Sequence, residues 1–274
     1  MSIKNILVGL APRGDSDPAG NFAISMAAAF KAHVAGRVYV LDPEVPVGAF
    51  NGLPADVLQS YRASATKEAE AAAKKFEEAA RRAKVQITHT VARATPGSAA
   101  AAFGRQARIY DLSILAQSAK GLEHVGDLFA EAALFHSGRP VIVVPKRKQA
   151  DFSCDRVLIA WDGGPHATRA VAAAMPVLAL AKKLEVLVIG NKALVQESQA
   201  RDLVRNLERH GFDAELICRD GDDIPQAIAT EAKTWSASLL VMGGYGRSRL
   251  TEWVFGGVTR FMLANPPLPV LMAH

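Results

Sequence analysis

The sequence contains few of the features that mark secreted, metal-binding or membrane proteins. Its two cysteines, Cys154 and Cys218, lie far apart, with no C-x-x-C pair and no neighbouring pair of histidines. Neither a disulfide framework nor a zinc site is therefore predicted. The first five residues run directly into a strand-like segment and lack the apolar stretch and cleavage site of a signal peptide. No apolar run approaches the ~20 residues of a membrane span. These absences favour a reduced, cytoplasmic location and predict no membrane partner.

Charge and composition exclude two further classes of protein. The chain of 274 residues carries a net charge of +5, but its basic residues are scattered and form no basic face interleaved with aromatic residues. We therefore interpret the charge as a solvated basic surface and predict no nucleic-acid partner. Hydrophobic residues make up 50% of the chain and charged residues 22%, which is typical of a globular protein and not of a disordered one. The length suits one large domain or two modest ones.

Short apolar runs alternate with segments of helical periodicity along the whole chain. Asp17 and Pro18 are suited to be the N-cap and the first residue of the first helix. The strands expected in the first half are 3–10, 34–41, 85–91, 112–116 and 141–144, and the helices are 17–33, 55–83, 97–108 and 128–136. The pattern then starts again, with strands at 155–161, 184–189, 214–218, 238–242 and 270–272 and helices at 166–182, 194–210, 224–235 and 258–264.

This alternation predicts an α/β protein made of two tandem open parallel five-stranded sheets with helices on both faces, a Rossmann-like arrangement. The predicted domains are 1–145 and 154–274. Residues 146–153 begin with a polar run without periodicity and form the predicted linker. Because the repeat is as long as a whole domain, a solenoid is excluded.

A glycine-rich stretch follows the fourth strand of the second half. It reads Gly-Gly-Tyr-Gly at 243–246, continues through an arm at 247–255 and ends as Gly-Gly-Val-Thr at 256–259. Glycines permit a positive φ and let a ligand approach backbone N–H groups. The start of a helix adds unpaired N–H donors and a partial positive charge. Because Arg247 and Arg249 supply further donors for an anion, the stretch predicts a cradle for a nucleotide phosphate.

Three better-known glycine signatures are absent. A dinucleotide fingerprint needs G-x-G-x-x-G after the first strand of its unit, whereas Gly244 and Gly246 follow a fourth strand and lack the third glycine. The nearest match to a Walker A loop, Gly121 to Gly126, is followed by Asp127, whose carboxylate would repel a phosphate. The pyrophosphate-cleaving signature S-G-G-x-D-S is also missing.

The remaining spacing resembles the ATP-binding motif of the universal stress protein family, G-x2-G-x9-G-[ST], at Gly243, Gly246 and Gly256. The sequence departs from the motif at Gly257, where the family has Ser or Thr, so a backbone N–H is kept and a hydroxyl contact is lost. The resemblance covers nearly all of the chain, although only the second half carries the motif. It implies an adenine nucleotide alpha hydrolase-like fold, which occurs as dimers of single domains and as tandem pairs. The implied cofactor is ATP, with or without Mg²⁺.

The resemblance implies an ATP site beyond the carboxyl ends of the strands, where ligands bind in open α/β sheets. An aspartate at the Asp162 position holds the ribose or base in the family, and Ile189 would line the adenine pocket. The implied ATP-binding residues are Ala160, Asp162, Ile189, Met242, Gly243, Tyr245, Gly246, Arg247, Gly256, Gly257, Val258 and Thr259. The residues also have structural interpretations: Asp162 as a cap or turn residue, Ile189 as strand core, and the glycines as helix and turn punctuation.

The first half lacks the corresponding features. Ala11 stands in place of Asp162, residues 116–120 replace the glycine-rich turn, and Ala130 and Glu131 replace the second pair of glycines. We therefore expect one adenine-nucleotide site per chain, in the C-terminal domain, and a degenerate N-terminal domain. A changed ligand in the N-terminal pocket is the alternative.

The chemistry around the motif favours binding over catalysis. No residue of the motif is an evident base, and His166, the histidine near the presumed site, is expected to be a capping or exposed residue. No catalytic residue and no protein metal site is predicted, although Asp222 and Asp223 are placed to approach a Mg²⁺ ion. We interpret the protein as an ATP-binding regulatory or stress-response module with at most slow ATPase activity. The alternatives are an enzyme that hydrolyses or adenylates a nucleotide and an adaptor that binds none.

The resemblance also bears on assembly. Family members usually pair through their fifth strands, which here are 141–144 and 270–272 of one chain, so an internal pseudo-dimer is implied. Such pairing covers strand edges that otherwise favour aggregation. A homodimer and an unidentified protein partner remain open.

Overall fold

The computed structural model describes residues 2–12, 17–42, 55–118, 123–146, 151–190, 193–245 and 257–274. Its contacts divide the chain into two compact units. The N-terminal unit consists of Ile3–Ser137 and Lys146–Phe152, and the C-terminal unit consists mainly of Gly138–Pro145 and Ser153–His274. This grouping assigns residues 138–145 and the predicted linker differently from the predicted domain boundaries, which stay a prediction.

The N-terminal unit alternates strands and helices as the sequence predicts. Its strands are β1 (Asn5–Leu10), β2 (His33–Leu41), β3 (Ile87–Ala94) and β4 (Leu112–Ala116), and its helices are α1 (Pro18–Phe30), α2 (Ala55–Arg82), α3 (Pro96–Ala107) and α4 (Glu123–Ser137). The strand order is β3-β2-β1-β4, and the pairs on both sides of β1 and β2 are parallel. Helix α1 begins at the predicted cap, since the Asp17 carboxylate accepts from the N–H of Gly20 and Pro18 opens the first turn.

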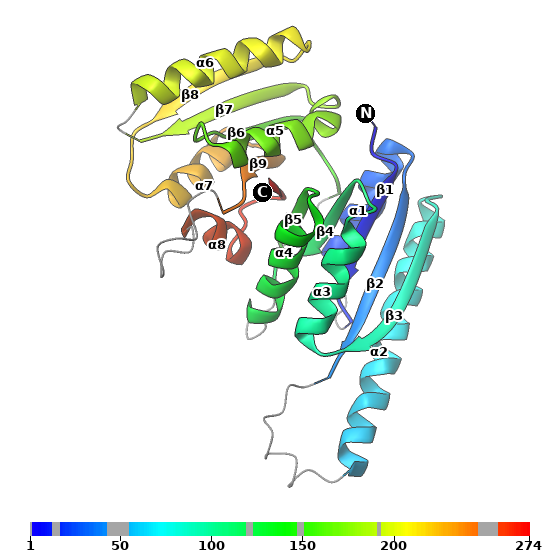
Figure 1. Ribbon diagram of the computed structural model, residues 1–274. Coiled ribbons are helices and arrows are strands. Elements are labelled where there is room, and N and C mark those ends of the chain that lie inside the picture. Colours follow the sequence, from blue (N-terminus) through cyan, green and yellow to red (C-terminus); the bar gives the residue numbers. More distant parts are fainter. Residues whose placement is uncertain are drawn as a thin grey trace. The chain divides into compact units, whose positions relative to one another are not determined.

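Two neighbouring residues of β1 show that helices cover both faces of this sheet. A side chain at Gly9 would meet Phe103 of α3, whereas the next residue, Leu10, lies beside Gly20 of α1 and Gly36 of β2. Because successive side chains of a strand point to opposite faces, α3 and α1 lie on opposite faces. Helix α4 packs along α3 (Figure 1).

The C-terminal unit repeats the pattern. Its strands are β5 (Val141–Val144), β6 (Arg156–Ala160), β7 (Lys183–Ile189), β8 (Ala214–Arg219), β9 (Leu239–Gly243) and β10 (Val270–Ala273). Its helices are α5 (Pro165–Leu178), α6 (Ala193–Arg209), α7 (Ile224–Thr234) and α8 (Gly257–Ala264). The strand order is β5-β10-β9-β6-β7-β8. The fold is therefore α/β with a mostly parallel sheet, as predicted.

One pair of strands in this unit is antiparallel. Strand β10 pairs with β5 in that direction, and Leu271 lies opposite Ile142. The two segments expected to be fifth strands thus pair with each other, while the implied pseudo-dimer stays a prediction. All four residues of each strand are buried, which explains their uninterrupted apolar sequences.

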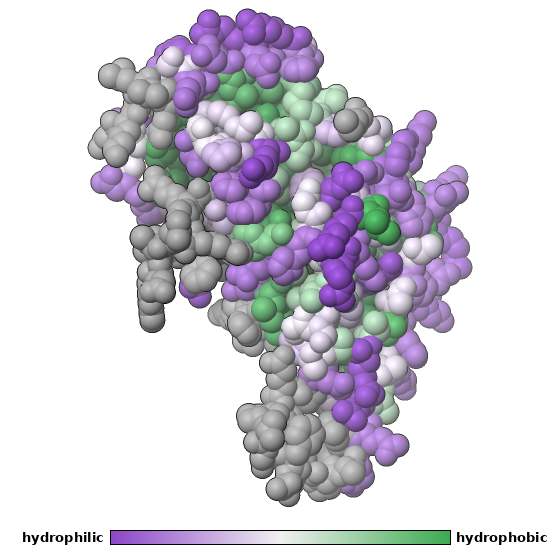
Figure 2. Space-filling view, viewed as in Figure 1, coloured by the Kyte–Doolittle hydropathy of each residue, from purple (hydrophilic) through white to green (hydrophobic). Residues whose placement is uncertain are grey.

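The helices of the C-terminal unit differ in how much they are covered. Helix α5 packs on β9 and β10, and α6 packs on β7 and β8. Helix α6 exposes charged residues such as Arg201, Arg205 and Arg209, and it forms the hydrophilic upper rim of the surface in Figure 2. This distribution explains why α6 was recognisable from its amphipathic sequence.

A buried carboxyl group lies in the middle of β7. Glu185 is only 3% exposed, and its Oε1 has no hydrogen-bond partner among the described residues. On the neighbouring strand β8, Arg219 donates two hydrogen bonds, of 2.5 and 3.0 Å, to the carboxylate of Glu231 on α7. Glu215 and Arg156 are the other charged groups near Glu185. Burial, followed by repulsion from Glu231, raises the pKa of Glu185 from 4.5 to about 7.

This shift predicts how stability depends on pH. The folded protein keeps the Glu185 proton up to about pH 7, whereas the unfolded chain releases it near 4.5. The contribution of this group is therefore fully present below the unfolded pKa and is lost as the pH rises through the folded pKa. Glu185→Gln removes the titration, so we expect its urea midpoint, relative to that of the wild-type protein, to increase between about pH 5 and about pH 8.

The matched control is Glu208→Gln, which removes an exposed carboxylate of α6 that is not among the charged groups acting on Glu185. Its midpoint relative to the wild-type protein should change little over the same range. A Glu185→Gln difference that is independent of pH contradicts the assignment.

Candidate functional site

Three of the predicted site residues lie together at the carboxyl ends of adjacent strands. Ala160 at the end of β6 is in register with Met242 of β9 on one side and with Leu187 of β7 on the other. Ile189 ends β7 two residues later. The chain runs from β6 outward through β7 and β8 and then returns to β9 on the other side of β6. The point where strand order reverses, at which open α/β sheets bind ligands, therefore lies between β6 and β9.

The loop after β6 brings Asp162 to this point. The N–H of Trp161 donates to the carbonyl of Leu187, which holds the loop against β7. Asp162 is exposed, and its Oδ1 accepts from the N–H of Gly164 at 2.8 Å. Gly164 is the N-cap of α5 and makes no side-chain capping bond. Asp162 thus has the turn role that its sequence allowed, and its carboxylate is also accessible to a ligand.

The first glycine of the motif lies against the start of α5. A Cβ at Gly243 would come within 2.7 Å of the backbone nitrogen of Ala167 and 2.9 Å of the Cβ of His166. These distances are shorter than any contact a real Cβ makes, and the nearest obstacle is backbone. Gly243 is therefore required for the close packing of β9 on α5, beside the switch point.

The next two residues form a turn held at several points. Gly244 donates its N–H to the carbonyl of Ala273 at 2.8 Å. Tyr245 adopts a left-handed conformation with φ of 54°, which is uncommon for a residue with a side chain. Its N–H donates to the hydroxyl of Thr259 on α8 at 2.9 Å. We call residues 243–245 the phosphate turn, after the ligand that the sequence predicts for it.

The hydroxyl of Thr259, a predicted ligand-binding residue, therefore makes a structural contact within the protein. Its side chain is 4% exposed, and its hydroxyl accepts from the backbone of the phosphate turn. The two preceding residues lie in the first turn of α8, where Gly257 is exposed and Val258 is half-buried. Outside its chain neighbours and its own helix, no atom of the described residues lies within 4 Å of the position of a Cβ on Gly257. The remaining predicted residues, Gly246, Arg247 and Gly256, lie outside the described residues.

Two histidines that sequence reasoning did not assign to the site lie behind the phosphate turn. The rings of His166 and His274 stack with centroids 4.2 Å apart, and Nδ1 of His274 lies 3.0 Å from the carbonyl oxygen of Gly244. Burial, followed by the neighbouring His274 and Arg169, lowers the pKa of His166. The signal for this contact is the register that places Ala273 beside Gly243, which the sequence does not show.

One of the two residues considered for Mg²⁺, Asp223, has a structural role. Asp223 is the N-cap of α7 and accepts from the N–H of Gln226 at 3.1 Å. Among the residues that the structure describes, there is no group of three or more histidine, cysteine, aspartate or glutamate side chains suited to a metal ion. None of the described helices is long and apolar enough to cross a bilayer.

The equivalent place in the N-terminal unit is filled by side chains. Gly9 of β1 is in register with Arg37 of β2, just as Ala160 of β6 is in register with Leu187 of β7. Tyr39 lies two residues after Arg37 and therefore corresponds to Ile189. The Tyr39 ring packs on Phe129 of α4 with centroids 5.5 Å apart, and Phe129 in turn packs on Phe103. The Asp17 carboxylate caps α1, and burial raises its pKa to about 6.

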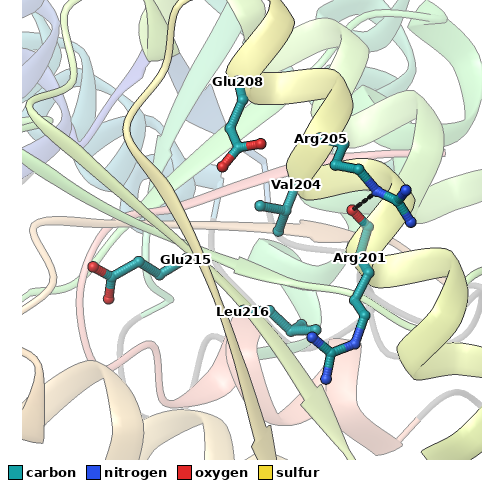
Figure 3. A pocket seen from close by; sticks show the side chains of 6 residues that line it. All are labelled: Arg201, Val204, Arg205, Glu208, Glu215 and Leu216. Carbon is teal, nitrogen blue, oxygen red and sulfur yellow. Dashed lines mark hydrogen bonds between the residues drawn. The ribbon is translucent and has the colours of Figure 1, made fainter.

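A hollow on the C-terminal unit lies away from the predicted site. It is an open depression of about 630 Å³ between α6 and β8, with Arg205 reaching the carbonyl of Arg201 (Figure 3). None of the predicted ATP-binding residues lines it; its lining is Arg201, Val204, Arg205, Glu208, Glu215 and Leu216. With charges of both signs and little enclosure, the hollow does not compete with the switch point as a nucleotide site.

Residues 188–274 match the family model described as the universal stress protein family. We call residues 188–274 the universal stress protein segment, after the family that they match. The universal stress protein segment begins in β7 and includes the phosphate turn and α8, whereas Asp162 precedes it. No curated protein sequence matched the chain.

Solved structures extend the likeness of fold beyond the universal stress protein segment. A universal stress protein from Archaeoglobus fulgidus DSM 4304 has a TM-score of 0.73 and 16% identity, covering 97% of this chain and 95% of its own. A functionally unknown protein from Pseudomonas aeruginosa PAO1 has a TM-score of 0.64 and 16% identity, covering 99% of this chain and 92% of its own. At this identity the similarity shows the fold.

The packing at Gly243 predicts a strong effect of a single methyl group. Because the added Cβ of Gly243→Ala meets backbone of α5, we expect a loss of about 1–3 kcal/mol in the free energy of unfolding, as for other overpacked sites. Urea denaturation measures it. Gly257→Ala, which adds the same atom where no neighbour lies within 4 Å, is the control. Equal stability of the two variants contradicts the predicted contact.

Proposed function

We propose that the C-terminal unit binds an adenine nucleotide, ATP, at the carboxyl ends of β6, β7 and β9, and that the protein is a regulatory or stress-response module. The observation that carries the proposal is the phosphate turn. It lies beside the strand-order switch, and a contact to Thr259 ties it to the first turn of α8. The turn also belongs to the universal stress protein segment.

Each part of the site has a chemical role in this proposal. Backbone N–H groups of the glycine-rich stretch and the positive end of α8 bind the phosphates, with Arg247 as an added cation. Gly246, Gly256, Gly257 and Val258 belong to this phosphate-binding group. The exposed Asp162 accepts hydrogen bonds from the ribose or base. The apolar wall for the adenine ring consists of Ala160, Ile189 and Met242.

Contacts in the N-terminal unit support one site per chain. The aromatic contact of Tyr39 with Phe129 fills the place that corresponds to the adenine wall. The Asp17 carboxylate caps the first turn of α1, the helix that corresponds to α5, and so lies where the C-terminal unit has the uncharged N-cap Gly164. Ala11 offers no acceptor to a ribose. The N-terminal unit is thus the degenerate member of two tandem domains, 1–145 and 154–274, joined by residues 146–153.

Binding without rapid hydrolysis agrees with the side chains near the turn. Phosphoryl transfer needs a group that positions the attacking water. His166 stacks on the His274 ring, and the proposal assigns the Asp162 carboxylate to the ribose or base, so neither is assigned to an attacking water. The proposal includes a cytoplasmic location, ATP with or without Mg²⁺, an internal pseudo-dimer based on β5 and β10, and an unidentified protein partner.

Isothermal titration with ATP tests the site, in buffers with and without Mg²⁺. Asp162→Asn keeps the acceptor that bonds to Gly164 while removing the charge, so it separates ligand binding from the turn. We expect a loss of about tenfold or more in ATP affinity, the size of one hydrogen bond to a charged group. Asp213→Ala removes an exposed carboxylate from the opposite end of the sheet and should leave the affinity unchanged.

Two independent measurements complete this test. Mass spectrometry of the denatured, purified protein should release ATP, ADP or AMP, and Gly256→Glu should abolish binding by placing a carboxylate against the phosphates. If no nucleotide is released and the wild-type protein binds ATP no better than these variants, the adaptor alternative holds. A turnover of about 1 s⁻¹ or more, at the low end of ordinary enzymes, favours the enzyme alternative.

Gly257, where the sequence departs from the family motif, gives a prediction of increased ATP affinity. Gly257→Ser restores the hydroxyl of the family motif at an exposed helix start, where an added Cβ meets no neighbouring atom of the described residues. We expect ATP affinity to increase about two- to tenfold, the range of one added hydrogen bond. Gly257→Ala has the same backbone effect without the hydroxyl and should not increase affinity. Equal affinities of the serine and alanine variants contradict the prediction.

A further inference from the structure

The peptide group that joins Gly244 to Tyr245 is held at both ends. Its carbonyl oxygen lies 3.0 Å from Nδ1 of His274, and its N–H donates to the hydroxyl of Thr259 at 2.9 Å. The two partners come from opposite sides of the turn, one after β10 and one from α8. The orientation of this one peptide plane is therefore determined by two side chains that are distant in sequence.

The contact with His274 specifies which ring nitrogen carries a proton. A carbonyl oxygen can only accept a hydrogen bond, so the Nδ1 of His274 is the donor. The His274 ring is positioned in turn by stacking on His166 at 4.2 Å, with an angle of 24° between the planes. His166 itself is in the first turn of α5, whose backbone lies against Gly243. One continuous set of contacts thus connects α5, His274 and the phosphate turn.

We propose that His274 is a positioning residue of the nucleotide site: its Nδ1–H holds the Gly244 carbonyl on the side of the turn away from Thr259 and the start of α8, where the phosphates are proposed to bind. This inference rests on the proposed function. A rotation of this peptide plane would turn the Gly244 carbonyl oxygen toward Thr259 and the start of α8, where it would repel an anion. The left-handed conformation of Tyr245 costs about 1–3 kcal/mol, and this cost favours such a rotation unless the surrounding contacts oppose it.

The inference predicts which ligands are affected. His274 contacts the phosphate turn, whereas the proposed adenine wall is formed by Ala160, Ile189 and Met242 on neighbouring strand ends. Loss of the hydrogen bond should weaken ATP binding and leave adenosine binding nearly unchanged. A purely structural role of His274 would affect both ligands equally, because it would act through the stability of the whole unit.

Two substitutions separate the hydrogen bond from the ring stack. His274→Phe keeps an aromatic ring against His166 but has no donor, whereas His274→Asn keeps an N–H at the same reach as Nδ1 but has no ring. Calorimetric titration should show His274→Phe weakening ATP about three- to tenfold, the range of one hydrogen bond, with adenosine within about twofold. His274→Asn should bind ATP within about twofold of the wild-type protein.

The comparison has outcomes that contradict it. If His274→Phe binds ATP as tightly as the wild-type protein, or loses adenosine to the same extent, the inference is wrong. Thr259→Val provides a second variant, because it releases the other end of the same peptide and should produce the same selective loss of ATP. If the wild-type protein itself binds neither ATP nor adenosine, the proposed function fails, and that result is distinct from the failure of the positioning role.

A ligand-free measurement tests the hydrogen bond directly. Long-range proton–nitrogen correlation spectra of the wild-type imidazoles distinguish the two neutral tautomers. We expect His274 to carry its proton on Nδ1 at a pH where it is neutral. A proton on Nε2 would leave Nδ1 without a hydrogen to donate to Gly244 and would overturn the inference, whatever the nucleotide titrations show.

Discussion

The contact between the end of β9 and the start of α5 is the constraint on which the candidate site depends. Gly243 touches the backbone of Ala167 and His166, so α5 lies as near to the sheet as two backbones permit. This approach determines where the first turn of α5 lies relative to the strand-order switch. It thereby positions the loop from β6, with Asp162, beside the turn that follows β9. Hydrogen bonds to the carbonyl of Ala273 and to the hydroxyl of Thr259 then position the rest of the turn.

The two units show one topology with different contents at the carboxyl ends of the strands. In the C-terminal unit, Gly243 packs on α5 and Asp162 exposes its carboxylate near the switch. In the N-terminal unit, Tyr39, Phe129 and the Asp17 carboxylate occupy the corresponding places. Unfilled space in a protein interior costs stability. A unit that does not bind a ligand is therefore more stable when its own side chains fill the pocket, which agrees with the composition of the first half.

Local patterns were sufficient for the elements because each element is determined by residues close together in the chain. The cap formed by Asp17 and Pro18 is one example. Element ends were less predictable: α4 begins at Glu123 instead of Leu128, because the polar first turn of an amphipathic helix carries little apolar periodicity. Helix α5 ends at Leu178, four residues earlier than predicted, and Lys182 and Lys183 donate their N–H groups to the carbonyl of Asp155.

The amino-acid sequence was enough to establish the alternation of strands and helices, the internal repeat, the glycine motif with its departure at Gly257, and the loss of that motif in the first half. The partners of the motif residues arise only in the folded chain. The Thr259 hydroxyl accepts a hydrogen bond from the N–H of Tyr245, 14 residues away in the chain, and His274 contacts the carbonyl of Gly244, 30 residues away. Such contacts depend on which strands become neighbours and in what register. Strand order is set by packing of the whole sheet, so no local pattern could reveal that His274 meets the phosphate turn.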